Sequence, residues 1–245
     1  NRLEVTGRDW EERQEGEEKG LLLYGRNPVK EAIDRGQPVE KVYVVDDNRR
    51  DGPLGEILSL AKAKKIAIQE LPAKRLEAMV AAQVSGGEKP VYQGIAAILP
   101  PVQYTQLEDM VDAARNGTDI PFLLVLDSIE DPHNLGAILR TAAAAGVNGV
   151  IIPKRRAASF NGPVVQTSAG AAFSVPIARE TNLVRCVERL KKEGFWIAGG
   201  DMSGEAMYDA PLDGPIALVI GSEGEGIGAL LKKNCDFLVS IPMVA

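Results

Sequence analysis

The sequence has a single histidine, two cysteines and no long hydrophobic run, and each shortage excludes a class of protein. His133 alone cannot form a histidine-rich metal site and leaves little for a Ser-His-Asp triad. Cys186 and Cys235 are too few for a disulfide framework, which fits a reducing compartment. No apolar run approaches the roughly 18 residues of a membrane span, and the first residues contain no signal-peptide core. We therefore expect a cytoplasmic protein with no metal and no membrane partner.

Basic residues are also fewer than acidic ones. The chain has 28 Lys and Arg against 34 Asp and Glu, a net charge of −6. A protein that coats nucleic acid without regard to sequence needs a basic surface, so this balance argues against that class. The deficit is not uniform, because residues 21–100 contain 12 basic and 10 acidic residues. The global charge therefore leaves selective recognition of a folded nucleic acid open.

What is present is ordinary globular composition, since 45% of the residues are hydrophobic, enough for a buried core. Residues 1–20 are highly charged and predict a flexible tail. Residues 21–100 alternate helical and strand patterns and predict a small α/β domain. Pro100-Pro101 begins a linker at 101–120. Residues 121–245 predict a second α/β domain with a parallel sheet, because strands alternate with helices.

Hydrophobic periodicity places the individual elements. In the first domain, Asn27 and Pro28 predict a helix start by N-cap and N1 chemistry. The further elements expected there are strands at 41–45, 66–69 and 94–99 and helices at 54–63 and 72–80. In the rest of the chain we expect helices at 107–115, 135–145, 162–169 and 182–193 and strands at 122–126, 150–152, 173–175, 195–198, 216–220 and 238–241.

Ligands of open α/β sheets bind beyond the carboxyl ends of the strands, so the segments that follow strands are the candidate sites. The first such segment contains His133 and Asn134 and leads into a helix with Arg140. If both Asn134 and Arg140 are helical, six residues turn the chain by about 600°, and the two side chains share no face. They converge only if Asn134 lies in the preceding loop. The alternative is a helix-capping Asn, a surface Arg and a loop histidine.

The second segment, Gly221-Ser222-Glu223-Gly224-Glu225-Gly226, has glycines that allow backbone N–H groups to approach a ligand. Residues 224–229 also match the GxGxxA dinucleotide fingerprint. That fingerprint should open a βαβ unit with an acid about 20 residues further on, and two glutamates would repel a pyrophosphate. No P-loop pattern is present. The third segment is Ser240-Ile241-Pro242-Met243, which alone indicates only a strand that ends at a proline.

Taken in order, these segments resemble the SpoU (TrmH) family of RNA ribose 2′-O-methyltransferases, in the SPOUT class. The family's first motif is matched by Asn134, Arg140-Thr141-Ala142 and Gly146, its second by residues 218–226, and its third by Ile241-Pro242-Met243. Further upstream, residues 24–29 resemble the opening of the substrate-binding domain in the RlmB-like branch. Residues 154–159 and 167–171 also resemble that branch, which methylates a guanosine of large-subunit rRNA.

The resemblance implies an L7Ae/L30e-like α/β substrate-binding domain and a SPOUT α/β catalytic domain with a mostly parallel sheet and a deep trefoil knot. It also implies S-adenosylmethionine as cofactor, rRNA as partner and a homodimer. The catalytic residues it implies are Arg140, Asn134 and Glu223, and the cofactor-binding residues are Gly199, Gly221, Gly226, Ile241 and Met243. The RNA-binding candidates are Lys154, Arg155, Arg156 and Arg26, with a second basic group at Lys62, Lys64, Lys65, Lys74 and Arg75; solvated surface positions are the alternative.

The family assigns Arg140 as general base, although a guanidinium stays protonated in proteins. A phosphate-bound Arg140 that stabilises negative charge on the ribose oxygen is the physical alternative. The family's third motif continues to a Ser-Leu-Asn segment, whereas only Val244-Ala245 follow here; we expect the native protein to carry that segment. A tRNA or resistance-type methyltransferase and a non-catalytic RNA-binding homologue remain as other functions.

Overall fold

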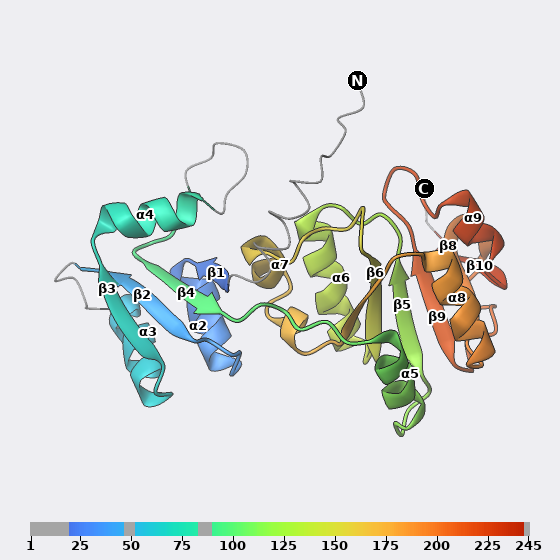
Figure 1. The fold of residues 1–245 in the computed structure, drawn as a ribbon, viewed down its shortest axis with the longest axis horizontal. Helices are drawn as coiled ribbons and strands as arrows, with labels where there is room; N and C mark the ends of the chain where they lie inside the picture. The colour runs from blue at the N-terminus through green and yellow to red at the C-terminus, as the bar shows by residue number, and fades with distance from the viewer. Residues whose placement is uncertain (1–19, 47–51, 83–89, 243–245) are drawn as a thin grey trace. The chain divides into compact units, whose positions relative to one another are not determined.

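Two β-sheets organise the chain, one with four strands and one with six. The structure is a computed structural model that describes residues 20–46, 52–82 and 90–242. Its elements fall into two units (Figure 1). The first consists of the described residues up to Val102 together with Ser159–Phe173, and the second of Gln103–Ala158 and the described residues from Ser174 onward. Most of the predicted flexible tail, residues 1–19, lies outside the described residues.

The first unit is a sheet with helices on both faces. Its strands have the order β1-β4-β2-β3, in which β4 is antiparallel to β1 and β2, and β2 is parallel to β3. The elements are β1 (Leu21–Tyr24), α2 (Arg26–Asp34), β2 (Lys41–Val45), α3 (Pro53–Ala63), β3 (Ala67–Leu71), α4 (Ala73–Ala81), β4 (Ile95–Leu99), α7 (Gly162–Thr167) and the 3₁₀ helix η1 (Ala171–Phe173). The segment Ser159–Phe173 adds Val165 to this unit's core, and Gln37 donates a hydrogen bond to the Ala169 carbonyl.

The start of α2 differs from the prediction. The helix begins at Arg26 and its N-cap is Gly25, so the prediction of Asn27 as the cap was wrong. Gly25 has a φ of +96°, a conformation that glycine adopts without steric cost, and its carbonyl accepts a hydrogen bond from the Val29 N–H. The short strand β1, which precedes this glycine and pairs with β4, was not predicted.

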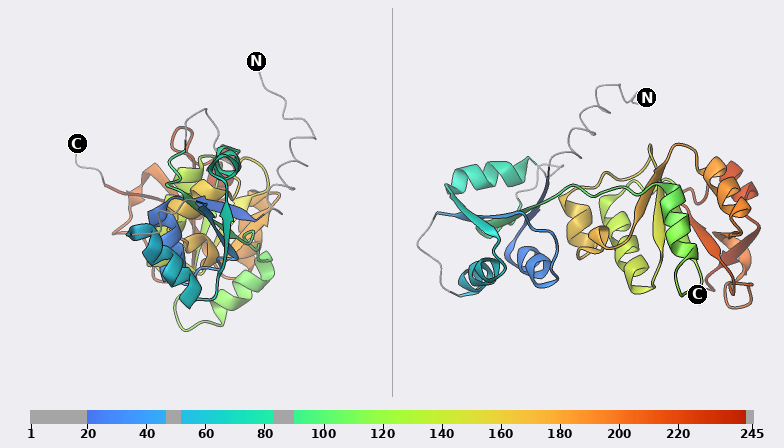
Figure 2. Two further views of the ribbon diagram at one scale, coloured as in Figure 1. Left: turned by 90° about the vertical axis from the view of Figure 1, so that its left-hand side faces the viewer. Right: turned by 60° about the horizontal axis from the view of Figure 1, so that its bottom comes forward.

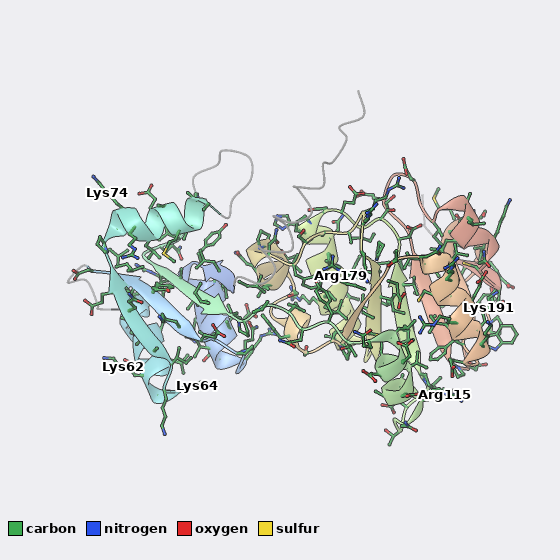
Figure 3. The ribbon with its side chains drawn as sticks, in the orientation of Figure 1. Lys62, Lys64, Lys74, Arg115, Arg179 and Lys191 are labelled. Atoms are coloured by element: carbon green, nitrogen blue, oxygen red, sulfur yellow. The ribbon has the colours of Figure 1, made fainter. Side chains whose placement is uncertain are left out.

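The basic residues of this unit do not form one group. The α2 and α3 side chains share a core with one face of the sheet, whereas Leu76 and Val80 of α4 belong to a separate cluster on the other face. Lys62 and Lys64 therefore lie with α3, and Lys74 lies with α4 across the sheet (Figure 3). The prediction of a single basic group was wrong because the sheet separates its members.

The second unit is built on six parallel strands in the order β10-β8-β9-β5-β6-β7. This confirms the predicted α/β fold with a mostly parallel sheet. The elements are α5 (Leu107–Arg115), β5 (Phe122–Leu126), α6 (Pro132–Ala144), β6 (Gly149–Pro153), β7 (Ile177–Glu180), α8 (Leu183–Lys192), β8 (Trp196–Ala206), β9 (Ile216–Ile220), α9 (Ala229–Lys233) and β10 (Phe237–Ser240).

Helices cover both faces of this parallel sheet (Figures 1 and 2). Helices α5, α8 and α9 share one core with Leu123 and Val125 of β5. Side chains alternate along a strand, so the equally buried Leu124 and Leu126 point to the opposite face, on the side of α6. Burial on both faces explains why β5 is a continuous apolar run rather than an alternating one.

One edge of the parallel sheet was predicted in the wrong place. The expected strand at 173–175 is wrong, because Ala171–Phe173 form a 3₁₀ helix and the strand is β7. The connecting chain covers this edge: Tyr104 forms a bridge with Ile177, and the Thr105 N–H donates to the Ile177 carbonyl at 2.7 Å. The Tyr104 ring also lies 4.8 Å from the Arg179 guanidinium. Covering an exposed strand edge in this way prevents pairing with other chains.

Both cysteines are free thiols, and their surroundings fit a packing role. Burial raises the pKa of the Cys186 thiol to about 12 and that of the Cys235 thiol to about 11. The thiolate is the reactive form, so neither side chain is a candidate nucleophile at neutral pH. None of the helices in the described part of the chain has the length and apolar character needed to cross a membrane.

Candidate functional site

Three neighbouring strands of the parallel sheet carry the predicted cofactor-binding residues. The strands β10, β8 and β9 are adjacent in the sheet. Gly199 of β8 is level with Val219 of β9, and Gly221 and Ile241 directly follow β9 and β10. Ligands of open parallel sheets bind at this carboxyl edge. Met243, the remaining predicted cofactor-binding residue besides Gly226, lies outside the described residues.

The loop after β9 closes on itself. The Ser222 N–H donates to the Gly226 carbonyl at 3.2 Å, and the Gly226 N–H donates to the Ser222 carbonyl at 2.9 Å. Gly226 has a φ of +67°, and a Cβ on Gly221 would lie 2.0 Å from the Gly226 carbonyl carbon. Glycine at 221 thus permits a close approach to the loop's own backbone, a role that the sequence did not indicate.

The tip of this loop presents backbone donors to its surroundings. Glu223, Gly224 and Glu225 are exposed, and the Glu225 N–H donates to the Ser222 hydroxyl at 3.3 Å. Within the part of the chain that the structure describes, the Glu223 and Gly224 N–H groups have no protein acceptor. The loop can therefore donate hydrogen bonds to a ligand that carries acceptor atoms.

Asp127, the first residue after β5, fastens the same loop to the β5–α6 connection. Its backbone N–H donates to the Ile220 carbonyl at 2.8 Å and so extends the pairing of β5 with β9. Its carboxylate accepts from the Gly228 N–H at 2.8 Å and from the Ser128 hydroxyl at 3.1 Å. The only sign of this residue in the sequence is a polar side chain immediately after a buried strand, too common a feature to predict its role.

We expect Asp127→Ala to lower the free energy of unfolding by about 1–3 kcal/mol, because the Gly228 N–H loses a charged acceptor. Urea denaturation followed by circular dichroism measures this loss. Asp127→Asn is the matched control, since its amide oxygen can still accept that hydrogen bond, and its loss should be smaller. An Ala variant as stable as the wild type would show that this bond does not hold the loop.

The helix α6 contains both polar residues of the first motif. Asp131 is its N-cap, accepting a hydrogen bond from the His133 N–H at 3.1 Å, and Pro132 is at the first helical position. Asn134 therefore lies in the first turn, and the predictions of Asn134 as the cap or in the loop and of a loop His133 were wrong. With Asn134 and Arg140 both helical, about 600° of rotation separates them and their side chains share no face.

Arg140 is an exposed cation on this helix. Neither Arg140, Asn134 nor Glu223 makes a side-chain hydrogen bond or ion pair with any described residue. The three predicted catalytic side chains are therefore not joined to one another by hydrogen bonds here. An unpaired guanidinium remains charged and keeps its five N–H donors for an incoming anion.

The predicted RNA-binding residues lie in two separate parts of the chain. Lys154, Arg155 and Arg156 follow β6 in the second unit and are exposed. The Lys154 N–H donates to the Glu180 carbonyl at 2.9 Å, which ties this turn to β7. Arg26, in the first unit, donates from Nε to the Gln93 carbonyl at 3.3 Å and is partly used in holding that turn. Across the residues described, no group of three His, Cys, Asp or Glu side chains is placed to hold a metal ion.

Comparisons with known proteins match both units. The model of the SpoU rRNA methylase family matches residues 121–245, and the model of RNA 2′-O ribose methyltransferase substrate binding matches residues 22–105. A Bacillus subtilis protein, YacO, whose name assigns it to the TrmH family of tRNA/rRNA methyltransferases, is 41% identical over 90% of this chain and 86% of its own length. A Staphylococcus haemolyticus protein with the same family name is 39% identical over 91% of this chain and 87% of its own.

Solved structures show the same fold. The structure of the SpoU methyltransferase AviRb from Streptomyces viridochromogenes in complex with AdoMet has a TM-score of 0.70 and 22% identity, covering 97% of this chain and 88% of that one. An AdoMet-bound rRNA methyltransferase from Sinorhizobium meliloti has a TM-score of 0.67 and 21% identity, over 99% of this chain and 88% of that one. At these identities the similarity concerns the fold alone.

Proposed function

Since the chain belongs to the SpoU rRNA methylase family, we propose that it methylates the 2′-hydroxyl of a ribose in RNA, with a guanosine of large-subunit rRNA as its target. The observation that carries this proposal is the order of two family models along one chain. A substrate-binding module at 22–105 precedes the methylase module at 121–245, so RNA recognition and group transfer are present together. The curated relatives are named for both tRNA and rRNA, which makes tRNA the second candidate substrate.

S-adenosylmethionine is the proposed cofactor, and the residues present fit it. The N–H groups of the exposed residues Glu223 and Gly224 have no protein acceptor among the described residues and can donate to its acceptor atoms, and the solved AviRb structure holds AdoMet. We assign Gly199, Gly221, Gly226, Ile241 and Met243 to its binding. When bound, it supplies an electrophilic methyl group on a sulfonium.

Arg140 is the proposed catalytic residue. A guanidinium does not give up its proton near neutral pH, so Arg140 does not act as a base. It binds RNA phosphate and stabilises the negative charge that develops on the ribose oxygen as the hydroxyl proton passes to solvent; the O–CH3 bond then forms as the S–CH3 bond of the sulfonium breaks. Asn134, which lies on another part of the α6 surface, orients the ribose rather than Arg140. Glu223, at the tip of the loop after β9, orients the substrate.

The proposal extends to assembly and location. We propose a homodimer whose contact includes α6, because Ala137, Thr141 and Ala144 leave an exposed helix surface of small residues that permits close packing. We also propose the trefoil knot of the family at the β10 end of the sheet, and a cytoplasmic location.

Lys154, Arg155, Arg156 and Arg26 contact the RNA backbone, which positions the substrate without specifying its sequence.

Transfer of labelled methyl groups tests this function. The full-length protein is incubated with labelled S-adenosylmethionine and deproteinised large-subunit rRNA, and 2′-O-methylated positions are mapped by their resistance to alkaline hydrolysis. We expect label at one guanosine of that rRNA. Label in tRNA alone would support the second candidate, and no label in any RNA would indicate a non-catalytic RNA-binding homologue.

A further inference from the structure

An open groove of about 400 Å³ lies in the second unit, on the part of the sheet formed by β5, β6 and β7. Its walls are the turns that follow these three strands and the first turn of α9. The volume is within the range of about 300–1,000 Å³ found for small-ligand sites. The proposed cofactor-binding residues lie on or after other strands, β8, β9 and β10, so the groove is lined by different residues.

The charged residues that line the groove have a net positive charge. Arg155 and Arg156 line it, and Asp127 is its one acidic lining residue. Both oxygens of that carboxylate already accept hydrogen bonds, from the Gly228 N–H and the Ser128 hydroxyl. Arg156 makes no hydrogen bond or ion pair through its side chain with any residue that the structure describes. An anion in the groove would therefore face two cations and a carboxylate whose charge is partly satisfied.

The amino end of α8 opens into the same groove. The helix has ten residues, and its N-cap Asn182 accepts a hydrogen bond from the Arg185 N–H. Leu183 and Val184 also line the groove, and their N–H groups have no acceptor within the described part of the chain. Unpaired N–H groups at a helix N-terminus and the helix dipole together favour a phosphate.

Two leucines also line the groove. Leu183 is buried, whereas Leu230, on α9, is 65% exposed although it is a large hydrophobic residue. Two lining residues, Ser128 and Arg156, have φ values of +59° and +58°, which non-glycine residues adopt at a cost of about 1 kcal/mol or more. Such strained residues tend to cluster at functional sites.

We propose that this groove binds one unpaired nucleotide of the substrate RNA. Its phosphate lies against Arg156 and the amino end of α8, and its base lies against Leu230 and Leu183. A paired base has its faces covered by its neighbours in the helix, so only a nucleotide splayed out of a loop or single strand can reach these leucines. The inference rests on the proposed function only in that the ligand is RNA.

Binding of two RNA probes to the full-length protein tests the groove without requiring methyl transfer. The probes are a fluorescent 12-nucleotide single strand and the duplex of the same sequence, measured by anisotropy. We expect Arg156→Ala to raise the Kd for the single strand about tenfold and to reduce the salt slope by about one. Leu230→Gln should raise the single-strand Kd about threefold to tenfold and leave the duplex Kd unchanged.

Matched controls carry the same chemical changes elsewhere in the second unit. Lys192→Ala removes an exposed cation in the last turn of α8, and Ile120→Gln replaces a residue that is 59% exposed just before β5. Both should bind the single strand within twofold of the wild type. Wild-type single-strand binding by Arg156→Ala and Leu230→Gln would overturn the proposal, as would equal weakening for single strand and duplex by Leu230→Gln.

Two further measurements separate this inference from the proposed function. A loss of S-adenosylmethionine affinity in the groove variants, measured by calorimetry, would assign the groove to the cofactor and overturn the nucleotide proposal. A second possible result is that the groove variants weaken RNA binding while the wild-type protein methylates no RNA. That result would support nucleotide binding in the groove and contradict the proposed methyltransferase function. A wild-type rate of methyl transfer by the Arg156→Ala, Leu230→Gln double variant would overturn the groove alone.

Discussion

Arg140→Ala is expected to reduce methyl transfer to RNA by about a hundred- to a thousandfold, the loss typical of removing one group that stabilises transition-state charge. Arg140 is exposed on α6 and has no side-chain partner among the described residues, so its removal should not disturb the fold. Alanine is also a better helix former than arginine. The measurement is the initial rate with labelled S-adenosylmethionine and rRNA, beside the cofactor Kd from calorimetry, which should be unchanged.

The conservative and control variants refine this prediction. Arg140→Lys keeps the charge but loses the planar fork of donors, so it should fail as well if phosphate is held by two parallel hydrogen bonds. Lys192→Ala, which removes an exposed cation from another helix, should retain the wild-type rate. Wild-type turnover by Arg140→Ala would remove Arg140 from the chemistry, and a matching loss of cofactor affinity would indicate a binding role instead.

Gly221→Ala is expected to lower methyl transfer by about a hundredfold, the effect of displacing a positioning loop by about 1 Å. The added Cβ would lie 2.0 Å from the Gly226 carbonyl carbon and 2.3 Å from the Ile227 nitrogen. These are backbone atoms, which cannot rotate away, so the closed loop must open. The same crowding should lower the free energy of unfolding by about 1–3 kcal/mol.

Gly224→Ala is the control for this effect, because a Cβ there meets nothing within 4 Å and φ is not positive. It lies in the same loop and should retain the wild-type free energy of unfolding. Urea denaturation of the two variants gives the comparison. Equal behaviour of the two would contradict the close contact of Gly221 with Gly226 as the reason for glycine at 221.

Local patterns predicted most elements of the second unit, because strands buried on both faces are continuous apolar runs. The predicted bounds of 122–126, 216–220 and 107–115 agree with β5, β9 and α5. The sequence Ile-Ala-Arg-Glu of β7 has no such run, and its pairing with β6 and Tyr104 decides that it is a strand. By contrast, the sequence contains enough information to predict that α6 begins at Pro132 rather than at residue 135. Asp131 and Pro132 are residue types typical of an N-cap and of the first helical position.

Some features of the candidate site could also be predicted from the sequence, and others could not. The motif residues were identified from the sequence alone, and their places at strand ends followed from the strand predictions. The grouping of β10, β8 and β9 follows from the strand order, which hydrophobic periodicity does not encode. The same is true of the groove, whose walls come from four segments that are distant along the chain.

By itself, the sequence determined the family, the α/β class and the residue types available for chemistry, because motifs and periodicity are local properties of the chain. Only the tertiary structure decided that Asp127 holds Gly228, which is 101 residues away, and that Arg156 and Leu230 face a common groove. Hydrogen bonds and grooves depend on which strands become neighbours, and that follows from the packing of the whole sheet.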